Sequence, residues 1–140
     1  SAKWHSKLGD EAVDDGKITT PSGRQYAFPD VIRRQSGQPT HFTMIKNYPV
    51  QGFATGDIVP IVFLEMDKRL EPLNSCIVNS VHDSIVVDVH PHEKDAVIQI
   101  ITDMNSNLNQ IIEEAYNVKM NVPMLLESKI GSNWLDIKDI

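Results

Sequence analysis

The sequence has almost none of the features that mark secreted or membrane proteins. Its 140 residues include one cysteine, Cys76, which has no second cysteine for an internal disulfide. No apolar run is long enough to span a bilayer, and the N-terminus lacks the charged-then-apolar pattern of a signal peptide. We therefore expect a globular protein of about one domain, in the reducing cytoplasm, with no membrane partner.

Basic residues are also scarce. The chain has 13 Lys and Arg against 19 Asp and Glu, a formal net charge of -6. Affinity for the phosphate backbone comes mainly from Lys and Arg, so composition alone argues against DNA binding. If the chain acts on nucleic acid, the basic surface should lie on other parts of a larger protein.

Periodicity in the first forty residues predicts a helix, a hairpin and a loop. Apolar residues four apart predict a helix over residues 3–13. Two strand-like runs, 17–20 and 24–28, flank Pro21-Ser22-Gly23 and predict a β-hairpin. The polar stretch 29–40 is typical of a loop.

An amphipathic pattern then predicts a helix from about Pro49 to Leu70. Pro60 should kink or interrupt this helix, because proline removes a backbone donor and crowds the preceding turn. Gly52 and Gly56 would let another backbone approach closely. Asp57 lies on the polar side of this helix, where a solvated or capping role is about as plausible as a functional one.

A second long helix should open at Pro91, with Glu93 and Asp95 favourably placed at its positive end. Its expected apolar face consists of Val97, Ile101, Met104, Leu108, Ile111 and Ala115. The run from Pro123 to Ser128 is strand-like.

Two apolar, β-branched runs, 76–81 and 85–89, are separated only by His82-Asp83-Ser84. This pattern predicts two antiparallel strands with a polar triplet at the tip. A carboxylate at such a tip is rigidly held yet exposed, which suits metal binding. In an arbitrary hairpin, however, the same triplet is most often a simple polar turn. A zinc site that adds His90 and His92 is less economical than a solvated helix start.

The order of motifs over more than a hundred residues favours a functional interpretation. In order, the chain carries Gly23-Arg24, Tyr26 to Pro29, Asn47-Tyr48-Pro49-Val50-Gln51-Gly52, Ala54, Asp57-Ile58 and Val81-His82-Asp83. This order resembles the C-terminal palm portion of family-A DNA polymerases over roughly residues 16–134. The residues within the motifs are similar to those of bacteriophage members.

The resemblance implies a role for each matching residue. Asp83 corresponds to the motif C aspartate that helps to hold two Mg²⁺ ions, and His82 would lie beside the primer end. Asn47 and Gln51 would contact the minor-groove side of the primer-template, where acceptors are common to all base pairs. Arg24 could also touch template phosphates in a full-length enzyme, although an arginine in a surface loop is usually just solvated.

The chain departs from the family pattern at Ser84, where many members have Glu. The resemblance also places the motif A aspartate and the nucleotide-binding fingers upstream of the chain. It implies that residues 1–15 end a helical fingers segment and that 16–140 form the C-terminal palm portion. We expect an α+β fold, with an antiparallel sheet of about three strands around the Asp83 hairpin, covered by two long helices.

We expect the chain to be one part of a template-directed DNA polymerase. It should be inactive alone, because it carries only one of the two aspartates that bind the metal ions. Its partners would be primer-template DNA, a dNTP and the N-terminal part of the polymerase. The sheet edge left without the motif A strand should promote self-association of the isolated chain. The alternative is a non-catalytic, palm-derived protein-interaction module, which would gain no activity from an added N-terminal fragment.

Overall fold

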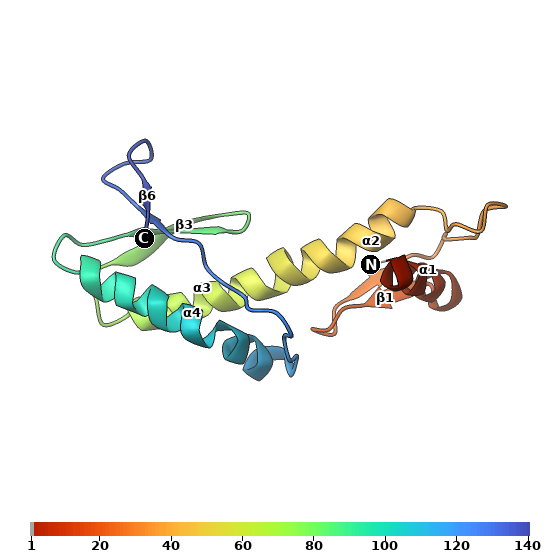
Figure 1. Cartoon of the computed structure of the whole chain (residues 1–140), viewed down its shortest axis with the longest axis horizontal. Helices are drawn as coiled ribbons and strands as arrows, with labels where there is room; N and C mark the ends of the chain where they lie inside the picture. Colours follow the sequence, from red (N-terminus) through yellow and green to blue (C-terminus); the bar gives the residue numbers. More distant parts are fainter. Residues whose placement is uncertain (1) are drawn as a thin grey trace. The chain divides into compact units, whose positions relative to one another are not determined.

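The computed structural model describes residues 2–140, which form two compact units that meet in sequence at Ile58 and Val59 (Figure 1). The first unit contains α1 (Ala2–Asp15), β1 (Lys17–Thr19), β2 (Gln25–Ala27), α2 (Phe42–Gln51) and the π-helix η1 (Gly52–Ile58). The second contains α3 (Val59–Leu70), β3 (Cys76–Val81), β4 (Ser84–Asp88), α4 (Lys94–Tyr116), β5 (Lys129–Ile130) and β6 (Lys138–Asp139). The predicted α+β class is confirmed. None of the described helices is long and apolar enough to cross a membrane.

The first unit is built on α1 and the β1–β2 hairpin, both where the sequence predicts them. Strand β1 pairs antiparallel with β2, and Ile18 lies opposite Tyr26. The turn is closed by the Gly23 N–H, which donates to the Thr20 carbonyl at 2.9 Å. Gly23 has φ 88, a left-handed conformation that glycine adopts without strain. The buried core of this unit consists of Leu8, Ala12, Ile18, Phe28, Val31 and Ile45.

The predicted loop over residues 29–40 is confirmed, and it is anchored on α1. Arg33 and Pro39 form an isolated β-bridge, and Arg33 also pairs with Asp10 of α1. Pro39 is buried against Gly9, where an added Cβ would lie 3.0 Å from the Pro39 Cγ atom. The small residue in α1 therefore lets the loop pack closely on the helix.

The next helical stretch begins earlier than predicted and contains an irregular turn near Pro60. It begins at Phe42 rather than at about Pro49, because His41 ends the loop with φ 57 and Ile45 is fully buried. The interruption expected near Pro60 lies just before this residue, and the helix resumes as α3 at Val59. The irregularity is the π-helix η1, directly before α3. Proline has no N–H for the carbonyl four residues earlier, so the regular α-helical bonding cannot be completed there.

The second unit packs α3 against α4. Helix α3 buries Val62, Met66 and Leu70, which repeat every four residues along one face. The buried residues of α4 are Val97, Met104, Leu108 and Ile112, so the predicted Ile111 is wrong at that position, and Ala115 is exposed. Each four-residue step advances slightly more than one turn, so the buried line winds around the helix instead of keeping the alternating spacing.

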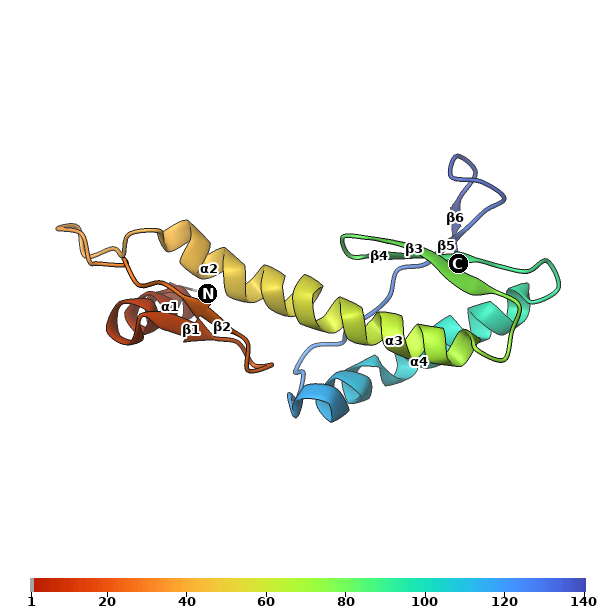
Figure 2. The same cartoon turned by 180° about the vertical axis from the view of Figure 1, so that it is seen from behind.

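The strands of the second unit form separate two-stranded sheets, not the expected sheet of about three strands (Figure 2). Strand β3 pairs antiparallel with β4, and β5 with β6. Helix α3 contacts both α4 and β3, so the β3–β4 hairpin is backed by helix on one side.

The predicted strand at Pro123 to Ser128 does not form within the described residues. Two asparagines of α4, one helical turn apart, bind its backbone instead. The Asn105 amide accepts from the Leu126 N–H at 2.6 Å and donates to the Leu126 carbonyl at 3.2 Å. The Asn109 amide accepts from the Met124 N–H at 2.9 Å. Side-chain amides thus take the place of a neighbouring strand.

Candidate functional site

The β3–β4 hairpin presents His82 and Asp83 as a two-residue turn. Val81 pairs with Ser84, so Ser84 belongs to β4 and not to the tip, where the sequence placed it. His82 adopts φ 56, a left-handed conformation that two-residue hairpin turns require. Both His82 and Asp83 are exposed to solvent. The carboxylate that was predicted to bind metal is therefore accessible and is carried by a paired strand ladder.

A bulge lies in the middle of this hairpin. Ile77 pairs with Val87 and Asn79 pairs with Val86, which leaves Val78 without an opposite residue. Such a bulge increases strand twist and re-aims the strand beyond it. It therefore helps to set the direction in which the His82–Asp83 turn projects.

The turn carries one carboxylate, that of Asp83. Among residues 2–140 there is no group of three or more His, Cys, Asp or Glu side chains placed to hold a metal ion. The exposed oxygens of Asp83 are of the type that Mg²⁺ prefers.

Asn47 and Gln51 project from α2 in the first unit. They are one helical turn apart, and both are exposed. The buried residues of α2 are Ile45 and Pro49, each two positions before one of this pair. Two residues correspond to more than half a turn, so the amides lie on the side of α2 opposite its buried face. Their side chains are available to a ligand.

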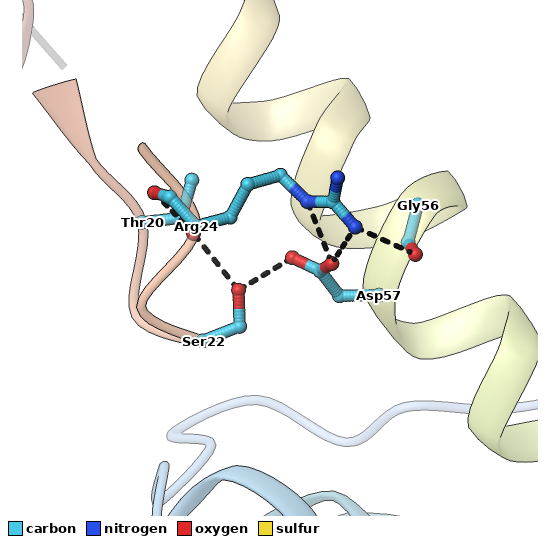
Figure 3. Close-up of polar contacts among 5 residues, drawn as sticks. All are labelled: Thr20, Ser22, Arg24, Gly56 and Asp57. Carbon is cyan, nitrogen blue, oxygen red and sulfur yellow. Dashed lines mark hydrogen bonds and ion pairs between the residues drawn. The ribbon is translucent and has the colours of Figure 1, made fainter. Parts of the chain in front are cut away.

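Arg24 lies in the first unit beside Asp57, and the two residues form an ion pair (Figure 3). Its Nε and Nη2 atoms donate to the Asp57 Oδ1 atom at 2.9 and 2.7 Å. Asp57 is 4% exposed, so the interpretation of this residue as a solvated carboxylate is wrong. The sequence pattern of α2 and η1 failed here because a π-helix shifts the residues that follow it relative to the 3.6-residue period.

Glu93 has a structural role that the sequence analysis missed. It was expected to interact with the N-terminal dipole of α4, yet its carboxylate binds the segment before β3. It accepts from the backbone N–H groups of Asn74 and Ser75, from the Asn74 amide and from the Ser75 hydroxyl. These bonds, the Asn74 N–H first and the Ser75 hydroxyl next, lower the pKa of Glu93 from 4.5 to about 2. No local pattern points to a contact between residues this far apart in sequence.

Comparison with known proteins settles the family. The sequence profile described as DNA polymerase family A matches residues 2–136. This chain belongs to that family. The prediction made from the order of the motifs is thereby confirmed.

The chain is similar to proteins named as DNA polymerases. It is 29% identical over 136 residues to a thermostable DNA polymerase I of Thermus filiformis, with 96% of this chain and 15% of the relative covered. It is 30% identical over 132 residues to DNA polymerase I of Caldicellulosiruptor bescii, with 91% and 14% covered. A DNA polymerase of Bacillus phage SP01 is 28% identical over 137 residues, with 96% and 15% covered. The chain therefore spans about one seventh of the length of these relatives.

Proposed function

We propose that the chain is one part of a template-directed DNA polymerase and supplies the motif C aspartate together with contacts to the primer-template. The observation that carries this proposal is the position of Asp83, exposed on a two-residue turn of a paired hairpin in a chain of the polymerase family. The names of its relatives, DNA polymerase I and a phage DNA polymerase, support the same assignment.

The proposed reaction is attack of the primer 3′-hydroxyl on the α-phosphate of an incoming dNTP, with release of pyrophosphate. Two Mg²⁺ ions, when bound, would stabilise the attacking and leaving oxygens. The Asp83 carboxylate would supply negative charge and oxygen ligands to that site. His82, its neighbour in the turn, would lie beside the primer terminus. Ser84 cannot supply the carboxylate that many family members have at this position.

Asn47 and Gln51 would check base pairing at the primer end. Their side-chain N–H groups can donate to purine N3 or pyrimidine O2 in the minor groove, and every correct base pair presents these acceptors. We propose that these contacts detect the shape of a correct pair without selecting a sequence. Arg24 was also predicted to contact DNA, but its Nε and Nη2 atoms donate to Asp57. Any phosphate contact would share the guanidinium with this ion pair.

The proposal requires an N-terminal partner. Residues 1–15 would end the fingers segment, although Ser1 lies outside the described residues, and 16–140 would form the C-terminal palm portion. The partner would supply the second aspartate, the nucleotide-binding fingers and the basic surface that a chain of net charge -6 lacks. We therefore expect the isolated chain to bind Mg²⁺ weakly and to incorporate no nucleotide.

The test is incorporation of a labelled dNTP after the chain is mixed with an N-terminal fragment that carries the upstream aspartate. Activity should appear only in the mixture and should be lost in Asp83→Ala. Asp88→Ala is the matched control, because Asp88 is an exposed aspartate on the same hairpin. It should keep most of the activity. Equal loss in both variants, or Asp83-dependent incorporation by the chain alone, contradicts the proposal.

The minor-groove contacts can be tested with a primer whose terminal purine has C–H in place of N3. In the active mixture this primer should extend more slowly than the natural one, because a donor loses its acceptor. Gln51→Ala should remove most of that difference while leaving the chain folded, since Gln51 is exposed. An unchanged difference in both Gln51→Ala and Asn47→Ala would contradict this assignment. A mixture that stays inactive would instead favour the protein-interaction module.

A further inference from the structure

We infer that Arg24, Ser22 and Asp57 form a clamp that fixes the helical turn after Gln51, and that Arg24 and Asp57 are positioning residues for Asn47 and Gln51. The inference rests on the proposed function for its consequence, but its structural basis lies entirely in the first unit. It gives Arg24 a role that differs from direct contact with DNA.

The clamp joins the β1–β2 hairpin to the end of η1 (Figure 3). Asp57 is almost fully buried, and both of its oxygens accept hydrogen bonds from the hairpin. Arg24 donates from Nε and Nη2 to Oδ1, and the Ser22 hydroxyl donates to Oδ2 at 2.5 Å. Hydrogen bonds to an ionised carboxylate are about twice as strong as neutral ones, so this buried group is firmly oriented.

The hairpin turn is itself arranged to direct Ser22 at Asp57. The Thr20 Oγ1 atom lies 2.8 Å from the Ser22 Oγ atom, and Thr20 is buried. Ser22 has one hydroxyl proton, and that proton goes to the Asp57 carboxylate. The Thr20 hydroxyl proton then lies between two acceptors, the Ser22 Oγ atom and the Arg24 carbonyl, which is 3.2 Å from the Thr20 Oγ1 atom. This relay holds the Ser22 hydroxyl in the orientation that the carboxylate requires.

A second bond from Arg24 explains why the clamp is at this turn. Gly56 lies four residues before Pro60, which has no N–H to donate to the Gly56 carbonyl. The Arg24 Nη2 atom donates to that carbonyl at 3.3 Å. An added Cβ on Gly56 would have its nearest contact at 3.7 Å, on the guanidinium carbon of Arg24. The arginine therefore satisfies a helix carbonyl that the proline leaves without a regular partner.

The same hairpin also holds the opposite end of η1. Tyr26 of β2 occupies the space over Gly52, where an added Cβ would lie 1.5 Å from the tyrosine hydroxyl oxygen. The hairpin thus contacts η1 at Gly52 and again at Gly56 and Asp57. A π-helical segment held at both ends cannot relax into regular α-helix without breaking one of these contacts.

This geometry matters because Gln51 directly precedes η1. If η1 relaxed to a regular α-helix, its wide turn would lose the one extra residue that it accommodates. The residues before η1 would then rotate about the helix axis by about 100° relative to Asp57. Asn47 and Gln51 would then face a different direction. A displacement of about 1 Å in a positioning group can lower a rate by about 100-fold.

The first experiment measures amide hydrogen exchange in the 140-residue chain alone. Arg24→Gln and Asp57→Asn should accelerate exchange of the η1 amides by about tenfold or more relative to those of α1. Arg33→Gln is the matched control, since Arg33 forms an exposed ion pair with Asp10 in the same unit. Arg33→Gln should leave the ratio of the η1 exchange rates to the α1 exchange rates unchanged. Equal acceleration in η1 and α1, or none, overturns the clamp.

The second experiment uses the active mixture with the N-terminal fragment and separates positioning from phosphate contact. A clamp predicts that Arg24→Lys and Asp57→Asn both lower the single-turnover rate by about 10-fold or more and both reduce discrimination against a mismatched primer end. The salt dependence of primer-template binding should not change. The double variant Arg24→Gln/Asp57→Asn should have a single-turnover rate little lower than that of either single variant, because the two changes break the same contact.

A phosphate contact predicts the opposite pattern. Arg24→Lys would then keep most of the activity, Asp57→Asn would keep or increase DNA affinity, and Arg24→Gln would reduce the salt slope by about 0.9. Those results overturn the inference. If the wild-type mixture incorporates nothing, the proposed function fails, and hydrogen exchange alone then decides whether the clamp exists.

Discussion

Replacing Gly52 with alanine isolates one contact of the β1–β2 hairpin with η1. Gly52 has φ -65 and ψ -39, ordinary helical values that alanine also adopts. In an unobstructed helix the change would stabilise the chain by about 1 kcal/mol. Here the added Cβ would lie 1.5 Å from the Tyr26 hydroxyl oxygen and 2.6 Å from its Cζ atom. The tyrosine ring must therefore move.

The expected net effect is destabilisation. Overpacking of this kind costs about 1 to 3 kcal/mol, and the overlap places this site near the upper end. Tyr26 is half-buried and packs on Tyr48 with ring centroids 5.7 Å apart, so displacing it also loses an aromatic contact. After subtraction of the helix-propensity gain, Gly52→Ala should lower the free energy of unfolding by about 2 kcal/mol.

The assay is urea unfolding followed by circular dichroism, with two comparisons built in. Gly56→Ala is the matched control, because its nearest contact would be 3.7 Å away, and it should be neutral or stabilise by up to about 1 kcal/mol. In a Tyr26→Ala background the obstruction is gone, so Gly52→Ala should become stabilising by about 1 kcal/mol. Stabilisation by Gly52→Ala in the otherwise unchanged chain would refute the argument, as would an equal effect in both backgrounds.

Three further predictions concern the second unit and the state of the isolated chain. Because the pKa of Glu93 is depressed, its stabilising effect is fully present above about pH 4.5 and is lost as the pH falls toward 2. The urea unfolding midpoints of Glu93→Gln and of the unchanged chain should therefore converge over that acid range. A difference between the two midpoints that stays constant with pH would contradict this. Asn105→Ala should cost about 1 to 2 kcal/mol by releasing Leu126, whereas Asn107→Ala, whose exposed amide bonds only the Asp103 carbonyl, should cost less than about 0.5 kcal/mol. Finally, sedimentation should show concentration-dependent self-association, because an unpaired sheet edge recruits other chains, and a strictly monomeric profile at high concentration would count against it.

The local patterns of the sequence predicted most elements but misjudged the helical stretch around Gly52. The α1 helix, the β1–β2 and β3–β4 hairpins and the loop before α2 were predicted because each depends on residues close together in the chain. The start of α2 was missed because buried Ile45 and the left-handed His41 define it, and the pattern was read from Pro49 onward. The strand expected at 123–128 does not form, because backbone groups of this segment bond to asparagines of α4.

The candidate site divides in the same way. Asp83, His82, Asn47 and Gln51 were found by sequence because the order and spacing of their motifs identify the family, and their exposure agrees with the roles proposed for them. Those roles remain proposals. The partner of Arg24 could not be found in this way, since nothing near residue 24 indicates that residue 57 lies beside it.

By itself the sequence determined the family, the α+β class and the residue at the tip of the hairpin, because these depend on motif order and on short-range periodicity. Only the tertiary structure decided that Asp57 is buried, that Arg24 and Ser22 bind it, and that Glu93 supports the start of β3. In each case a carboxylate is bound by donors from residues distant in the chain. The folded arrangement selects such partners, because a buried or hydrogen-bonded carboxylate must be satisfied by whatever donors the packing brings to it.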